Sequence, residues 1–187
     1  GEVTFDNVAV YNVEETKPEL EEKDPLVLAS FDDESAMDSW AGETGYQYFH
    51  GGDSNATPDI SYDANEAAKD GRLKVSLNYS KNSKESWSEA KVKYTNADGV
   101  DVSNYNQVSV DLIYSGENPV GKMKFYTDGI INKDCTVDTT DAKDLGNGLH
   151  KVTVTMGFSP TETPLKDLTI GLIGVNSSFI GDVYLDN

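Results

Sequence analysis

The 187-residue sequence contains one cysteine, Cys135, and two histidines, His50 and His150. A single cysteine excludes an intramolecular disulfide, and these residues are too few for a zinc site. The sequence has no run of about 18 apolar residues, so no transmembrane helix is expected. It opens at Gly1 with no signal peptide, and we interpret this start as that of an excised segment.

Positive charge is also scarce, since 15 lysines and arginines stand against 33 aspartates and glutamates, for a formal net charge of −18. Such a surface repels nucleic-acid phosphates and anionic lipid headgroups, so neither nucleic acid nor a membrane is expected as a partner. Neutral ligands, cations and basic proteins remain as partners. A simpler interpretation is that the charge only keeps the protein soluble.

A short pattern, Gly-acid-Val-x-apolar-Asp-Asn, occurs at residues 1–7 and again at residues 181–187. A spacing close to one domain length indicates tandem modules that end on the same kind of strand, although two strand ends can also match by chance. Residues 14–25 are acidic and contain prolines, which is linker composition. We therefore predict that residues 1–13 are the terminal strand of a preceding similar module, or a docking strand, and that residues 26–187 form one β-sandwich module.

Apolar and polar residues alternate with a period of two through much of the chain, which predicts β-strands. No segment keeps a helical period beyond about two turns. Short antiparallel strands with one polar face predict an all-β protein, an antiparallel β-sandwich or jelly roll. The predicted strands are residues 26–31, 72–79, 90–94, 107–114, 121–126, 151–156, 168–175 and 181–186, with a turn at 96–99.

The alternation turns some large aromatic side chains toward polar faces. In the segment that begins at Trp87, the apolar positions face the core, so Trp87 shares the other face with Glu89 and Lys91. The same alternation in the strand at 121–126 turns Tyr126 outward. Large rings on polar faces are informative exceptions to the rule that such residues are buried.

A sugar ring has an apolar face of C–H groups and a rim of hydroxyls, so a site for it needs a flat aromatic ring with polar side chains beside it. Trp87 meets this requirement, unless it only closes an edge of the core. The polar side chains expected beside it are those of Glu89, Lys91 and Asn78. Trp40 lies in a segment dense with aromatic residues and either forms a second platform or plugs the end of the sandwich.

Acidic residues stand near both ends of the predicted domain. Asp32 follows the strand at 26–31, and Asp186 ends the last strand. Hard carboxylate oxygens from the first and last strands could share one structural Ca²⁺ and hold the ends of the domain together. The EF-hand spacing is absent, and acidic clusters are usually solvated turns.

Several motifs follow one another in a fixed order over about residues 26–187. Their order and spacing resemble those of the mannan-binding carbohydrate-binding modules of families 27 and 23, which accompany bacterial β-mannanases. The motifs are Leu28-Ala29-Ser30-Phe31-Asp32, Trp40, Gly71-Arg72-Leu73-Lys74-Val75, Trp87-Ser88-Glu89-Ala90-Lys91-Val92, Asp101-Val102-Ser103-Asn104-Tyr105 and Val183-Tyr184-Leu185-Asp186-Asn187.

This resemblance implies a β-jelly roll with a structural Ca²⁺ and a cleft that binds β-1,4-mannan or galactomannan through tryptophans. By position, Trp40 and Trp87 match the first two platforms of the family. Asp32 and Asp186 match its metal-binding acids. The third tryptophan, expected after the strand at 121–126, is missing, and Tyr126 is the candidate substitute.

We therefore expect a secreted, non-catalytic module that targets an attached glycoside hydrolase, part of a multidomain β-mannanase, to mannan. One alternative is a β-sandwich that binds another glycan or serves as a structural spacer. Another is a small hydrolase, for which the sequence marks neither a Ser–His or Cys–His arrangement nor a particular pair of carboxylates.

Overall fold

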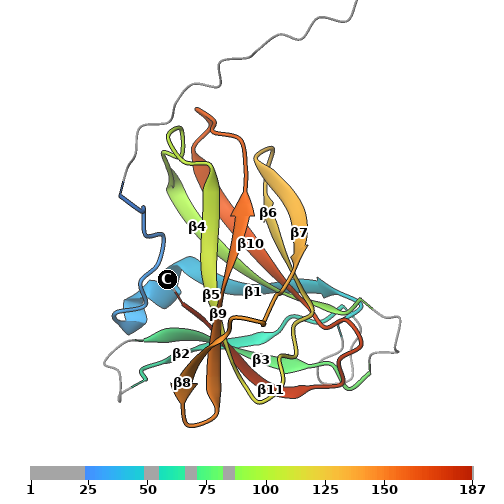
Figure 1. Ribbon diagram of the computed structural model, residues 1–187. Helices are drawn as coiled ribbons and strands as arrows, with labels where there is room; N and C mark the ends of the chain where they lie inside the picture. Colours follow the sequence, from blue (N-terminus) through green and yellow to red (C-terminus); the bar gives the residue numbers. More distant parts are fainter. Residues whose placement is uncertain (1–23, 49–54, 66–70, 82–86, 187) are drawn as a thin grey trace, which may run out of the picture.

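The computed structural model in Figure 1 describes residues 24–48, 55–65, 71–81 and 87–186. The terminal or docking strand predicted at residues 1–13 and nearly all of the linker predicted at residues 14–25 lie outside the described residues. The described chain forms two antiparallel sheets that enclose one hydrophobic core, which confirms the predicted all-β antiparallel sandwich. Within these ranges, no helix is long and apolar enough to cross a membrane.

The first sheet has five strands in the order β1-β4-β10-β6-β7. Its neighbouring strands are all antiparallel, and β10 lies between β4 and β6 as the central strand. The strands are β1 (Trp40–Tyr46), β4 (Glu89–Val100), β10 (Leu165–Ile173), β6 (Lys122–Thr127) and β7 (Ile131–Thr136).

The second sheet has six strands in the order β2-β3-β11-β5-β9-β8. A short 3₁₀ helix, η1 (Glu34–Ser39), precedes β1, and the side chain of Asp33 caps it by accepting a hydrogen bond from the backbone N–H of Ser35. The strands are β2 (Asp59–Asp63), β3 (Arg72–Asn78), β11 (Ile180–Asp186), β5 (Gln107–Ser115), β9 (Leu149–Gly157) and β8 (Lys143–Gly146).

The core consists of the inward-facing residues of both sheets. Leu73 and Val75 of β3 are fully buried, and so are Val92 of β4, Phe125 of β6 and Leu172 of β10. These are the apolar positions of the alternating patterns, and each contributes roughly 1.5–3 kcal/mol through the burial of its side chain. The same alternation sends the intervening polar residues to the outer faces, where a ligand can reach them.

The segment at residues 26–31 does not form the predicted strand. Leu26 and Val27 are 44% and 60% exposed, and Phe31 has a φ of 53°, in the left-handed region that a strand does not allow. The segment instead lines an apolar cavity near one end of the sandwich. Its apolar residues therefore meet the core from the end and pair with no sheet.

The turn predicted at residues 96–99 is instead an irregularity inside β4. Thr95 pairs with Asp167 and Val100 with Leu165, so the intervening residues of β4 bulge out of the ladder. The side chain of Asn96 accepts hydrogen bonds from the backbone N–H groups of the residues two and three positions later. The hydrogen bonds of a turn are therefore present, but they bend one long strand and do not separate two strands.

Candidate functional site

The outer face of the five-stranded sheet brings together several of the predicted site residues. Figure 1 shows β4, β10 and β6 side by side, and the register aligns Lys93 of β4 with Thr169 of β10 and Tyr126 of β6. In the adjacent row, Lys91 is aligned with Gly171 in the middle of the sheet. Because these strands are antiparallel and in register, the outward side chains form straight rows across the face.

Two adjoining hollows lie on this face, and Tyr126 lines both of them. We call the first, of about 560 Å³, the aromatic hollow; its lining includes Tyr46, Trp87, Glu89, Lys91, Lys124 and Tyr126. We call the second, of about 640 Å³, the polar hollow; its lining includes Lys93, Tyr126, Asp128, Asn132, Asp167 and Thr169.

Trp87 has the largest aromatic side chain of the aromatic hollow, and 44% of its surface is exposed. The carbonyl of the next residue, Ser88, accepts a hydrogen bond from Gly174 N–H at 2.9 Å, which ties the segment to the end of β10. The ammonium of Lys122 lies over the indole, 4.4 Å from the ring centre. These contacts confirm that Trp87 lies on the outer face, as the alternation predicted.

Tyr46 is a second exposed ring in the aromatic hollow, and it was missing from the predicted site. It ends β1 in register with Glu89 and is 57% exposed. The sequence did contain a signal, because Tyr46 belongs to the aromatic-rich segment around Trp40. Alternation could not identify it, because the register of β1 shifts just before Tyr46.

Glu89 of β4 and Tyr126 of β6 meet across β10. The hydroxyl of Tyr126 donates a hydrogen bond to Oε1 of Glu89 at 2.6 Å, and Nζ of Lys91 lies 3.9 Å from Oε2. Burial, followed by this hydrogen bond and the nearby carboxylate charge, raises the pKa of Tyr126 well above its ordinary value. The phenol therefore stays protonated at physiological pH, and its hydroxyl remains a donor to Glu89.

The face carries both signs of charge, although the whole chain is strongly acidic. Its cations and anions compensate one another locally, and the pairing with Lys122 lowers the pKa of Asp134. The ammonium of Lys124 lies 4.3 Å from the ring centre of Tyr126. The ion pairs are Lys91–Glu89 at 3.9 Å, Lys93–Glu43 at 3.8 Å, Lys93–Asp167 at 3.5 Å and Lys122–Asp134 at 2.9 Å.

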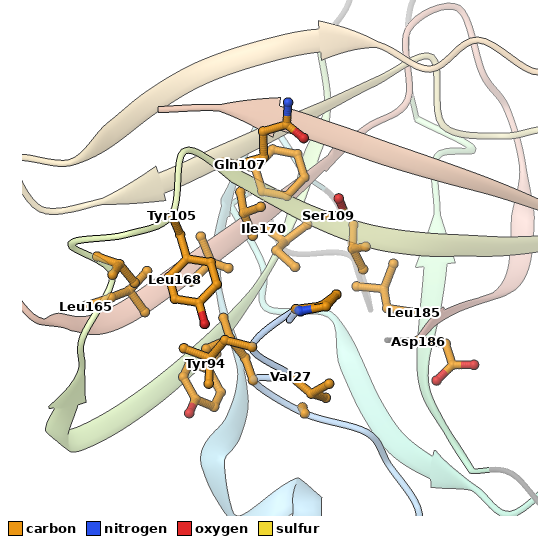
Figure 2. Close-up of a pocket in the computed structure, with 18 of the residues that line it drawn as sticks. Val27, Tyr94, Tyr105, Gln107, Ser109, Leu165, Leu168, Ile170, Leu185 and Asp186 are labelled. Carbon is orange, nitrogen blue, oxygen red and sulfur yellow. The ribbon is translucent and has the colours of Figure 1, made fainter. Parts of the chain in front are cut away.

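Trp40 does not lie on this face. It pairs with Tyr94, which points into the core, and its ring packs 5.5 Å from Tyr94 and 5.7 Å from Phe31. It lines the apolar cavity of about 380 Å³, which Figure 2 shows with Leu168 and Ile170 among the lining residues. The prediction of a second surface platform is therefore wrong, because the inward parity of β1 at this position makes Trp40 a plug for the end of the sandwich.

Asn78 is also separate from the residues that line the two hollows. It ends β3, in the six-stranded sheet, and its side-chain oxygen accepts hydrogen bonds from the N–H and the hydroxyl of Ser80. It lines neither hollow. Its predicted place beside Trp87 is wrong, because alternation assigns a residue to a face of its strand but does not say which sheet the strand joins.

The predicted metal ligands lie near the first and the last residues of the described chain. Asp32 is exposed and accepts a hydrogen bond from the Ser30 hydroxyl at 2.7 Å, while Asp186 is buried at the end of β11, in register with Asp111. In the part of the chain that the structure describes, no group of three or more His, Cys, Asp or Glu residues could hold a metal ion. The described side chains alone therefore do not fit a carboxylate-rich site, and the calcium site stays a prediction.

Comparison with known proteins adds evidence on the fold. No protein-family model matches the sequence, and no curated protein matches it significantly. Among solved structures, it is similar to TmCBM27, a carbohydrate-binding module studied for specific mannan recognition, with a TM-score of 0.62 and 18% identity over 85% of this chain and 91% of that one. The chain has the fold of a carbohydrate-binding module.

Two further carbohydrate-binding modules have a similar fold. CBM27-1 of Caldicellulosiruptor saccharolyticus, solved in complex with mannohexaose, has a TM-score of 0.54 at 16% identity over 80% of this chain and 87% of that one. A family 28 module specific for non-crystalline cellulose has a TM-score of 0.59 at 21% identity over 88% and 94%. The fold that the resemblance to family 27 implied is thus confirmed.

Proposed function

We propose that the outer face of the five-stranded sheet binds a polysaccharide, and that β-1,4-mannan or galactomannan is its ligand. The observation that carries this proposal is the exposed indole of Trp87 beside a hollow that also contains Tyr46 and polar side chains. Exposed aromatic rings that flank a hollow rich in hydrogen-bonding groups suit the alternating apolar and hydroxyl surfaces of a sugar chain. The likeness to mannan-binding modules supports this choice of ligand.

Lys122 gives Trp87 a defined orientation. Because its ammonium lies over the indole and is itself bonded to Asp134, it holds the ring from one side, and 44% of the Trp87 surface remains exposed for stacking. A ring that is already fixed loses little conformational entropy when a ligand binds. Tyr46 then serves as the second stacking surface of the aromatic hollow.

Tyr126 has another role in this proposal. Its hydroxyl is bound to Glu89, and the ammonium groups of Lys91 and Lys124 lie 5.2 and 4.3 Å from the centre of its ring. It is therefore better suited to divide the two hollows and to orient polar groups than to replace a missing tryptophan platform. The polar hollow beyond it would bind sugar hydroxyls by hydrogen bonds.

We further propose that the chain is a secreted, non-catalytic module that holds an attached glycoside hydrolase near its substrate. The pairing of four acidic side chains of the face with lysines supports a binding role; these are Glu43, Glu89, Asp134 and Asp167. Reducing sugar released from galactomannan by the pure protein would contradict this part of the proposal.

Affinity electrophoresis in gels containing galactomannan, xylan or β-glucan tests the ligand. We expect retardation in the galactomannan gel and its loss in Trp87→Ala. Leu145→Ala is a matched control, because Leu145 is 40% exposed but belongs to β8 of the other sheet. Unchanged retardation of Trp87→Ala would refute the assignment of the site, and no retardation of the wild type in galactomannan would refute the ligand.

Non-crystalline cellulose is a second candidate, favoured by the likeness to the family 28 module. Mannan and cellulose are both β-1,4-linked and differ in the orientation of the hydroxyl at C2, so a stacking surface alone does not distinguish them. Calorimetric titration with mannohexaose and with cellohexaose compares the two directly. Tighter binding of cellohexaose would identify the second candidate as the ligand.

A further inference from the structure

Glu89 is a carboxylate that is nearly buried on the outer face of a sheet. It begins β4, pairs with Ile173 of β10, and lines the aromatic hollow, yet its side chain is only 8% exposed. An outward-facing glutamate in a strand normally extends into solvent, where its charge is hydrated. Neighbouring residues of the sheet must therefore leave space for this side chain and fix its position.

Gly171 provides the room. A Cβ atom at this position would lie 2.1 Å from Oε1 of Glu89, 2.9 Å from Cδ and 3.1 Å from Cγ, so the carboxylate occupies the space of the missing side chain. Gly171 is not among the glycines with positive φ, so its backbone does not itself require glycine. A glycine inside a central strand lowers the stability of the sheet, and here the close approach of Glu89 explains it.

Tyr126 fixes the direction of the carboxylate. Its hydroxyl donates to Oε1 at 2.6 Å, and a hydrogen bond to a charged acceptor is roughly twice as strong as a neutral one. Lys91 stands 3.9 Å from the other oxygen, Oε2. A carboxylate offers about four lone-pair positions, so acceptor capacity remains after these contacts, next to the exposed ring of Trp87.

We propose that Glu89 is the specificity-determining acceptor of the aromatic hollow, that Gly171 and Tyr126 are positioning residues that hold it in place, and that its charge restricts the site to uncharged polysaccharides. This inference rests on the proposed function. A carboxylate only accepts hydrogen bonds, so the hydroxyls of a neutral sugar can donate to it. The carboxylate of a uronic acid cannot donate and is repelled.

The lysines around the hollow do not reverse this selection. Lys91 is paired with Glu89 itself, and Lys122 with Asp134. The ammonium of Lys124 lies over the ring of Tyr126. Among the residues that the structure describes here, each of these lysines is thus paired with a carboxylate or lies over an aromatic ring, whereas an acidic polysaccharide would need cations held apart from anions.

The decisive variant is Gly171→Ala, because it displaces the Glu89 carboxylate without changing any charge or removing any polar group. We expect it to weaken binding of mannohexaose at least about tenfold, as expected for loss of a hydrogen bond to a charged group. Gly157→Ala is the matched control: Gly157 ends β9 in the other sheet, and a Cβ there would meet only Asn106 O, at 3.8 Å. Its affinity should equal that of the wild type.

A positioning role also predicts non-additivity. In a Glu89→Ala background no carboxylate is left to displace, so adding Gly171→Ala or Tyr126→Phe should leave the affinity unchanged. If Gly171 or Tyr126 acted only through the general stability of the sheet, replacing it would still lower the affinity in this background. Full additivity of these changes would overturn the positioning roles, and so would wild-type affinity in Gly171→Ala.

Selectivity is measured with hexagalacturonate as the acidic probe, in parallel with mannohexaose. We expect wild-type protein to bind only the neutral hexasaccharide. In Glu89→Gln, we expect a smaller difference in affinity between the neutral and the acidic hexasaccharide. Equal binding of both probes by the wild type would overturn the exclusion of charged ligands but leave the proposed site intact. Failure of the wild type to bind any neutral hexasaccharide would refute the proposed function, and this inference with it.

Discussion

Replacing each of the chain's two tryptophans with alanine separates the packing role of one from the binding role of the other. Trp40 packs against Phe31 and Tyr94 inside the sandwich, whereas Trp87 is 44% exposed beside the aromatic hollow. Removing a core tryptophan costs about 3–5 kcal/mol, and we use about 3 kcal/mol because Trp40 is only partly buried. For a domain of this size, that corresponds to a melting temperature lower by about 6–12 °C.

Trp87→Ala should give the reverse result. A substitution at an exposed position changes the free energy of unfolding by within about 0.5 kcal/mol, so the melting temperature should move by less than about 2 °C. Loss of a central aromatic contact removes about 2 kcal/mol or more of binding energy, which is about a 30-fold loss of affinity for mannohexaose.

Differential scanning calorimetry and titration calorimetry measure the two quantities on the same samples. We expect Trp40→Ala to bind with nearly wild-type affinity at a temperature where it is folded. A Trp40→Ala protein that kept its melting temperature and lost its affinity would refute the assignment of Trp40 to the core. Equal loss of stability in both variants would refute the contrast between the two positions.

Two predictions concern ions and protons. If Asp32 and Asp186 take part in a structural calcium site, EDTA should lower the melting temperature without abolishing the fold and Ca²⁺ should restore it, whereas no shift would argue against an occupied site. Hydrogen bonds to the Asp33 and Asp138 carboxylates and to Asp134 hold their pKa values below the ordinary 3.8 in the folded protein. Their contribution to stability is therefore complete above that pH and is lost as the pH falls through the lower folded-state values, so the melting temperature should decrease in acid. A melting temperature that rose below pH 3.8 would contradict this sign.

Strand alternation predicted the architecture because burial on one face of a strand leaves a clear trace in the sequence. It correctly turned Trp87 and Tyr126 outward, because the core residues Ala90 and Val92 in one segment and Met123 and Phe125 in the other have the opposite parity. The short edge strands were harder to predict: the residues of β8 are all exposed, and β7 is buried at its first residue and mostly exposed after it. Strands with no buried face carry no alternation to detect.

The assembly of the site depended on information that alternation does not contain. Asn78 and Trp87 both belong to polar faces, but sheet order places their strands in different sheets. Trp40 was assigned by its position in a family pattern, and the register of β1 with β4 turns it inward. Gly171 did leave a signal, because a glycine inside an apolar strand pattern indicates close approach of another group.

The proposed site brings together three departures from the ordinary pattern of a sheet surface. Trp87 is a large aromatic residue left exposed, Glu89 is a carboxylate nearly buried on a sheet surface, and Gly171 is a glycine in the central strand of its sheet. A glycine inside a strand and a carboxylate removed from water each lower stability. Because natural sequences tend to keep such local conflicts where function requires them, their convergence on the same sheet face is itself an argument for a ligand there.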